Sequence, residues 1–362
     1  MIITGLLVGA VLGLVLQRGR FCITGAYRDL WVSHSWRWFT AFLLAIAVQA
    51  VGVALLTATG VITPEIPTLN VFAVVVGSFL FGVGIVLAGG CATGTYYRAG
   101  EGLVGSWFAL IAYAGAAAAS KTGVLAPLTD WAKSVWSTSL TTIPATVALP
   151  DWTGVALLAV IVAALVRWQR RLAEARPVSL QLPAERTGLN HLLFEKAWNP
   201  LVTGVIVGVV AIIAWPTSWA SGRHVVTGDS TKVDWGVLLV LGILLGSFVS
   251  AKASGEFRVR VPSATVIQRS IAGGVLMGVG AAWAGGCSIG NGLVQTSLLS
   301  WQGWLALVFQ IVGAGAAAYV TIIRPREQRR RERAAARAQA LAAPAPVSPD
   351  QAVSASSPAA AR

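Results

Sequence analysis

The sequence predicts an all-α polytopic integral membrane protein built from two pseudo-symmetric halves. Of its 362 residues, 56% are hydrophobic and 11% are charged, and the mean hydropathy is +0.71. A soluble domain of this length needs far more charge on its surface. Uncharged runs that suit helices in lipid recur along the chain, and one glycine-rich motif with a cysteine occurs twice. These three observations determine the predicted fold class.

The first half is expected to cover residues 1–166. Its first apolar run, Leu6–Leu16, is followed by several arginines and by no cleavage site, which indicates an uncleaved helix that ends on the cytoplasmic side. The stretch from Lys121 to Asp151 is mixed in character and is expected to hold an amphipathic interfacial helix. Other helices of this half are expected at Trp38–Thr59, Val71–Ala88, Trp107–Ala119 and Thr153–Val166.

A basic linker, residues 167–197, separates the halves, and its arginines and lysine place it in the cytoplasm. The second half is expected to cover residues 198–325. Residues 326–362 are basic and then rich in Ala, Pro and Ser, a composition that predicts a disordered tail. Helices of the second half are expected at Trp198–Trp215, Trp235–Ser250, Ser270–Ala284 and Trp301–Ile323.

The net charge of +13 is interpreted as a topology signal, not as a surface for nucleic acid. In an integral membrane protein basic loops report orientation, and the lipid bilayer is the nearest partner. Basic segments on both sides of Ser270–Ile323 require this stretch to cross the membrane an even number of times. Two full helices meet this condition and a re-entrant hairpin with one helix does not, and the sequence leaves the choice open.

Neither a metal site nor a cofactor site is expected. The three cysteines form no C-x-x-C pair, and the histidines, His34, His191 and His224, lie in unrelated segments. No Walker-type phosphate loop is present, which argues against direct coupling to ATP.

The repeated motif reads Leu-Ala-Gly-Gly-Cys-Ala-Thr-Gly at residues 87–94 and Trp-Ala-Gly-Gly-Cys-Ser-Ile-Gly at residues 283–290. Each copy ends an apolar run, and paired glycines favour a helix stop there. Thr93 or Ser288 then suits the beginning of a new, short helix. A helix broken inside a membrane is tolerated where it is packed in protein or lines a wet cavity, and helix N-termini attract anions. The motif therefore predicts a passage for a small anion.

Cys91 and Cys287 hold matching places in the two copies, where packing alone would accept Ala or Ser, and this favours a functional role. Cys22 aligns with Arg258, so it has no partner, and the residues alone leave its role open. A neutral thiol is a weak donor with a soft sulfur, which suits a sulfur-bearing ligand. Further residues expected along the passage are Gly90, Thr93, Gly94, Gly286, Ser288, Gly290, Asn291 and Gln268.

Three segments, residues 18–22, 89–94 and 285–292, together resemble the YeeE/YedE sulfur-transport family, and the similarity extends over residues 1–325. The resemblance implies a multi-pass protein of the bacterial inner membrane that takes up thiosulfate and is not an enzyme. It also implies that Cys22, Cys91 and Cys287 relay the anion through transient S–H···S hydrogen bonds, with short helices that meet near the bilayer midplane. Some relatives work with a small TusA-like sulfur-carrier protein in the cytoplasm.

Three alternatives stay open. The first is a transporter of another sulfur or selenium species, because other members of the family are assigned such substrates. The second is a membrane thiol-redox or sulfur-transfer enzyme, which predicts a disulfide or persulfide intermediate. The missing C-x-x-C pair and the lack of a haem or quinone ligand pattern argue against it. The third is a membrane scaffold that transports nothing.

Overall fold

The computed structural model describes residues 3–174, 187–188, 191, 194, 198–221 and 235–342. Within these ranges the regular structure is helical, and eight helices are long and apolar enough to cross a membrane. This confirms the predicted all-α polytopic class. The chain forms two compact units, Met1–Ala318 and Tyr319–Arg362.

The first unit contains most of the helices. Before the predicted linker they are α1 (Ile3–Gly19), α2 (Ile23–Val32), α3 (Arg37–Ala58), α4 (Val71–Leu87), α5 (Ala92–Gly100), α6 (Val104–Lys121), α7 (Ala126–Ser134), α8 (Ile143–Thr146) and α9 (Asp151–Glu174). After it they are α11 (Pro200–Trp219), α12 (Trp235–Ala253), α13 (Ala264–Trp283), the π-helix η2 (Gly290–Gln295) and α14 (Trp301–Ala318).

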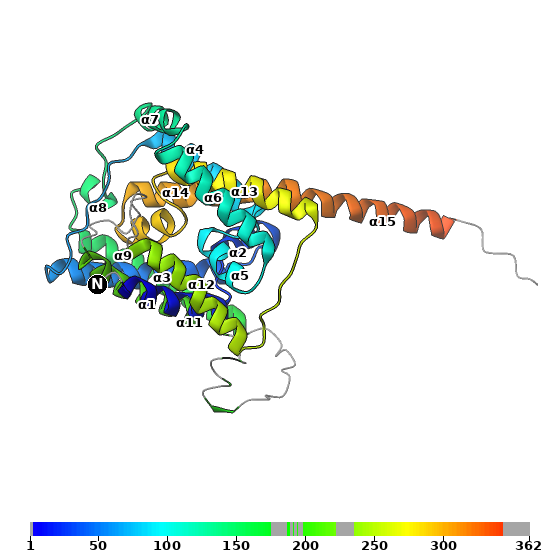
Figure 1. The fold of residues 1–362 in the computed structure, drawn as a ribbon, viewed down its shortest axis with the longest axis horizontal. Coiled ribbons are helices and arrows are strands. Elements are labelled where there is room, and N and C mark those ends of the chain that lie inside the picture. The colour runs from blue at the N-terminus through cyan, green and yellow to red at the C-terminus, as the bar shows by residue number, and fades with distance from the viewer. Residues whose placement is uncertain are drawn as a thin grey trace, which may run out of the picture. The chain divides into compact units, whose positions relative to one another are not determined.

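The long helices form two groups, and the short helices α2 and α5 lie between them. In one group α1 packs along α12, and α3 packs along α11 and α9. In the other group α4 packs against α13 and α14, while α6 packs against α13. Figure 1 shows both groups with α2 and α5 between them. Because α5 contacts α12 and α6, and α2 contacts α3 and α14, the short helices connect the two groups.

Several helix boundaries differ from the expected ones. α13 begins at Ala264 instead of Ser270, and α11 continues past Pro216 to Trp219. Pro216 lies in the last turn of α11, where its ring costs one hydrogen bond and does not break the helix. α9 extends to Glu174, so the predicted linker begins as helix, and most of its remainder lies outside the described residues. α13 and α14 each begin a candidate membrane span, which satisfies the even number of crossings.

The second unit contains η3 (Tyr319–Ile323) and α15 (Arg324–Ala342). The sequence predicted a disordered tail from residue 326, and over residues 326–342 the structure has a helix instead. α15 is rich in Ala, Arg, Glu and Gln, which are strong helix formers, so composition alone favours this helix without a buried apolar face. Residues 343–362 lie outside the described residues.

Glycines spaced four residues apart permit the close packing of α1 on α12. Gly5, Gly9 and Gly13 lie on one face of α1, and a Cβ at Gly9 or Gly13 would collide with the backbone of Leu239 or Ile243 on α12. Small residues at this spacing are the usual means by which membrane helices approach each other closely.

We expect Gly9→Leu to lower the thermal unfolding midpoint of the detergent-solubilised protein, because overpacking of such a contact costs about 1–3 kcal/mol or more. Gly115→Leu on α6 is the matched control, since an added Cβ there meets no atom within 4 Å. Equal midpoints for the two variants would contradict the packing described here.

Candidate functional site

Two of the three cysteines lie at the beginning of the short helices between the two groups. Cys22 is the N-cap residue of α2, and Cys91 is the N-cap residue of α5. Just before them, Arg20 (φ +48°) and Gly89 (φ +73°) adopt the left-handed conformation, which ends the preceding helix. Each of these two cysteines therefore lies beside the free N–H groups and the positive end of a helix.

Cys91 caps α5 with its own sulfur. The Gly94 N–H donates to Cys91 Sγ at 3.3 Å, and the thiol lies 3.9 Å from Thr93 Oγ1. Thr93, which we expected near the helix start, is the second residue of α5, and the cap hydrogen bond belongs to the cysteine. Cys91 itself is 1% exposed. Its thiol is therefore a buried group held in a defined position.

Gly94 brings the sulfurs of Cys22 and Cys91 to the same place. A Cβ built on Gly94 would lie 3.4 Å from Cys91 Sγ and 3.6 Å from Cys22 Sγ. Both sulfurs thus face the bare backbone at Gly94, and a side chain at this position would fill the space that they share.

Arg98 connects Cys22 to the first Gly-Gly turn. One guanidinium nitrogen donates to the Gly89 carbonyl oxygen, and Nη2 donates to Cys22 Sγ at 3.8 Å. A cation therefore lies beside the Cys22 sulfur. We did not include Arg98 among the predicted site residues. It follows Cys91 by seven residues, two helical turns, so the common face of Cys91 and Arg98 is the sequence signal that points to it.

The second Gly-Gly turn leads into a different structure. Gly285 has the same φ of +73° as Gly89, but the π-helix η2 follows Cys287 in place of an α-helix. Asn291 holds this turn: its Nδ2 donates to the carbonyl oxygens of Ala284 and Gly286, and its Oδ1 accepts from Gln302 Nε2 at 2.9 Å. Asn291, predicted to line the passage, thus has its amide occupied by the turn.

Cys287 approaches the other cysteines through shared neighbours. Tyr27 and Cys91 belong to one buried cluster, Cys287 packs against this cluster, and the Tyr27 O–H donates to Gln310 Oε1 at 3.5 Å. Ser288 lies near the Cys91 sulfur, and among the described residues no other group forms a hydrogen bond with its buried hydroxyl. Because the sulfurs of Cys22 and Cys91 both lie close to Gly94, and Cys287 packs against the cluster that contains Cys91, the three cysteines lie in one region between the helix groups.

The other predicted residues support the turns or lie elsewhere. A Cβ at Gly90 would lie 3.3 Å from the Gly94 backbone, and one at Gly286 would lie 3.0 Å from Asn291 Oδ1, so both glycines shape the turns. Gly290 is buried at the beginning of η2. Gln268 does not join the site: α13 begins early enough to place it, exposed, in the first turns of that helix.

An apolar cavity of about 60 Å³ reaches Cys91 from one side. Val8 on α1 and Trp235 at the start of α12 line it, as do Cys91 and Thr93. Apolar side chains of α1, α11, α12 and η2 line most of it. The volume suffices for several water-sized groups beside the thiol.

A second cavity, of about 430 Å³, lies at the other end of α5, and we call it the basic cavity. Backbone pairing fixes its wall, because the Arg260 N–H donates to Gly102 O at 3.0 Å and the Val104 N–H donates to Arg260 O at 3.2 Å. The residues that line it are Arg20, Tyr97, Arg98, Glu101, Leu103, Gly255, Glu256, Arg258 and Arg260.

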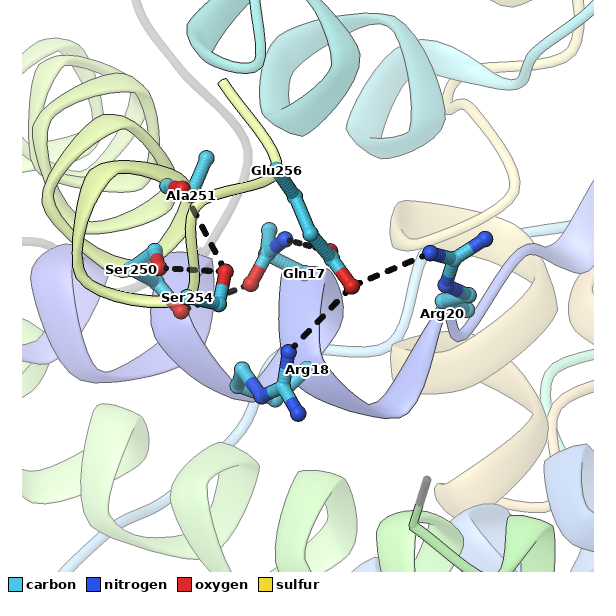
Figure 2. A network of polar contacts seen from close by, with 7 residues as sticks. All are labelled: Gln17, Arg18, Arg20, Ser250, Ala251, Ser254 and Glu256. Atoms are coloured by element: carbon cyan, nitrogen blue, oxygen red, sulfur yellow. Dashed lines mark hydrogen bonds and ion pairs between the residues drawn. The ribbon is translucent and has the colours of Figure 1, made fainter. Parts of the chain in front are cut away.

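Glu256 ties the end of α1 to the loop after α12. Figure 2 shows its carboxylate between the side chains of Gln17, Arg18 and Arg20, at distances of 2.8, 3.6 and 3.2 Å. The Gln17 amide is fixed in turn, because Ser250 Oγ donates to Gln17 Oε1 at 2.7 Å. The Glu256 carboxylate is therefore held by two hydrogen bonds and by a longer ion pair with Arg18, and it lines the basic cavity.

Glu101 adds a second carboxylate to the basic cavity. Burial raises the pKa of Glu101, and the nearby charge of Glu256 acts in the same direction. A hydrogen bond from Gln17 and the charges of Arg98 and Arg20 oppose this rise in pKa. Glu101 consequently takes up a proton at a higher pH than an exposed glutamate does.

Comparison with known proteins shows similarity over nearly the whole first unit. Residues 18–316 match the model of the family described as Sulphur transport. The thiosulfate transporter TsuA of Escherichia coli (strain K12) is 47% identical over 340 residues, which are 90% of this chain and 96% of that protein. TsuA of Spirochaeta thermophila is 34% identical over 352 residues, 90% of this chain and 100% of that protein. The probable transporter YedE of Salmonella typhimurium is 44% identical over 103 residues, 28% of this chain and 25% of that protein.

Proposed function

Because this chain belongs to the sulphur transport family, we propose that it carries thiosulfate across the bacterial inner membrane. The family prediction is confirmed, as is a transport function in place of an enzymatic one, since the similar proteins are named transporters. Two relatives that match 90% of the chain are named thiosulfate transporters, and this supports thiosulfate over other sulfur or selenium anions.

The observation that carries the proposal is the pair of sulfurs at Gly94, between two cavities. Cys91 lines the apolar cavity, and Cys22 contacts Arg98, which lines the basic cavity. Basic loops on the side of the basic cavity assign that side to the cytoplasm. In uptake the anion therefore meets Cys91 first and Cys22 second.

The cysteines act as weak, successive binding positions, and no covalent bond forms. Each thiol offers an S–H donor to the terminal sulfur of thiosulfate, and the N-termini of α2 and α5 offset the cost of removing the dianion from water. Binding that is weak at each position suits transport, because the anion must leave as readily as it enters. Cys287 completes the relay from the side of η2.

Soft sulfur contacts also favour thiosulfate over sulfate, which carries oxygen alone. Specificity is the difference between the binding free energies of the two anions. A path lined by thiols binds thiosulfate more favourably, because only thiosulfate has a terminal sulfur that the thiols can contact. A small TusA-like sulfur-carrier protein in the cytoplasm remains a predicted partner.

Growth of a cysteine-requiring, sulfate-uptake-deficient bacterial host on thiosulfate tests the function. We expect the wild-type chain to support growth, and we expect the Gln268→Ala variant, altered on the exposed face of α13, to do the same. Membrane-inserted wild-type protein that supports no more growth than an empty vector would contradict thiosulfate uptake.

A further inference from the structure

The basic cavity has the charge of a binding site for a divalent anion. Four arginines and two glutamates line it, which leaves a net charge of +2 when both carboxylates are ionised. Arg258 and Arg260 are exposed, and within the part of the chain that the structure describes neither forms an ion pair with a carboxylate. A dianion that enters this cavity therefore meets an excess of positive charge.

Arg98 joins the cavity to the thiols. Its guanidinium lines the cavity and also donates to Cys22 Sγ. An anion that leaves Cys22 thus passes directly to a cation, with no apolar layer between them. Guanidinium groups suit oxyanions because their N–H donors form a planar fork.

A carboxylate of the chain already neutralises part of the positive charge of the cavity. Arg20, whose side chain is 73% exposed, reaches Glu256 at 3.2 Å, and Glu256 also lies 3.6 Å from the buried Arg18. Glu256 is therefore placed to compete with an incoming anion for the same guanidinium groups (Figure 2). Without such a competitor the cavity would hold a dianion tightly and release it slowly.

We propose that the basic cavity is the cytoplasmic release site for the transported dianion, and that Glu256 is an internal counter-anion that speeds its release. The dianion displaces Glu256 from Arg20 as it enters the cavity from Arg98. Glu256 then returns to Arg20 as the dianion leaves. The identity of this dianion as thiosulfate rests on the proposed function, whereas the role of Glu256 rests on the contacts around the cavity.

Inside-out membrane vesicles give a direct test, because their medium faces the basic cavity. Radiolabelled thiosulfate taken up by such vesicles binds first in this cavity, so the KM reports its affinity. We expect Glu256→Gln, which keeps the shape and loses the charge, to lower this KM by roughly three- to tenfold, as the loss of one competing ion pair predicts. The Vmax is expected to fall together with the KM, because the more tightly bound dianion leaves the cavity toward Cys22 more slowly.

Two further variants complete the test. Arg258→Gln combined with Arg260→Gln removes two positive charges, so we expect the KM in the same vesicles to rise. Glu65→Gln is the matched control, since Glu65 is exposed and does not line the cavity. Opposite shifts in KM do not arise from misfolding, which reduces the amount of active protein and hence the Vmax.

The results separate this proposal from the proposed function. If wild-type vesicles carry thiosulfate while Glu256→Gln and the double arginine variant keep the wild-type KM, the release site is overturned and thiosulfate transport stands. If the wild-type protein carries no thiosulfate in either direction, both proposals are overturned.

Discussion

Cys91→Ala is expected to reduce thiosulfate uptake by about tenfold or more, the factor that corresponds to losing about 1.4 kcal/mol of interaction in the transport path. Cys91 is the cysteine that lines the apolar cavity, so under the proposed direction of uptake its thiol is the first sulfur that the anion meets. The variant also loses the cap hydrogen bond from Gly94, which costs about 0.5–2 kcal/mol of stability. The protein is therefore expected to remain folded. Initial rates of radiolabelled thiosulfate uptake by intact cells, at equal expression, measure the effect.

Cys91→Ser separates the cap from the sulfur. A serine hydroxyl keeps the cap hydrogen bond to the Gly94 N–H and a donor at the same place, but it removes the soft sulfur. We expect the serine variant to be as stable as the wild type and to retain less discrimination between thiosulfate and sulfate. Wild-type rates in both Cys91 variants would show that the anion does not pass this thiol.

Gly94→Ala is expected to lower uptake severely and yet to leave the protein as stable as the wild type or more so. The new methyl group would touch the sulfurs of both Cys22 and Cys91 at ordinary contact distances, so it fits the fold but fills the space that they share. Alanine is also favoured over glycine in a helix by about 1 kcal/mol. The uptake rate and the thermal unfolding midpoint, measured on the same preparation, are expected to change in opposite directions.

Gly25→Ala is the matched control for this effect. Gly25 follows Cys22 by three residues in α2, as Gly94 follows Cys91 in α5. An added Cβ at Gly25 lies 3.8 Å from Cys22 Cβ and within 4 Å of neither sulfur. We expect this variant to transport at the wild-type rate. If Gly94→Ala matches it, the space between the two sulfurs is not part of the path.

Much of the fold could be predicted because it follows from local composition. Apolar runs identify the long helices, and the glycine pairs identify where α4 and α13 end. The capping of α5 by Cys91 was missed, because cysteine is not among the residue types that usually cap a helix. Threonine is one of them, so the sequence pointed to Thr93 instead. The π-helix after Cys287 was missed as well, since its i→i+5 hydrogen bonds leave no clear sequence pattern.

The polar part of the site could not be predicted because it joins distant parts of the chain. Gln17 and Glu256 are separated by 239 positions, and Cys22 and Arg98 by 76. Whether such groups meet depends on how α1 packs on α12 and on where α5 lies, and no local pattern reports that. The basic residues of the loop after α12 were interpreted as a topology signal, whereas two of them also line a cavity.

The relation between the two halves remains a prediction. Halves related by a pseudo-two-fold axis would exchange helix pairs, so a contact of α1 with α12 requires one of α11 with α3, and a contact of α4 with α14 requires one of α13 with α6. All four of these contacts are present. They support the predicted arrangement, although η2 has no counterpart of the same helical type in α5.

In the proposed relay, thiosulfate passes the cysteines through hydrogen bonds, without covalent chemistry. Intact-mass spectrometry of the reconstituted protein, quenched with a thiol-blocking reagent during thiosulfate transport, tests it most directly. We predict that Cys22, Cys91 and Cys287 all remain free thiols during transport. Each is then recovered carrying the blocking reagent, in the same proportion as without thiosulfate. A persulfide, an S-sulfonate or a disulfide that accumulates on any of them during transport would contradict the claim and favour a sulfur-transfer enzyme.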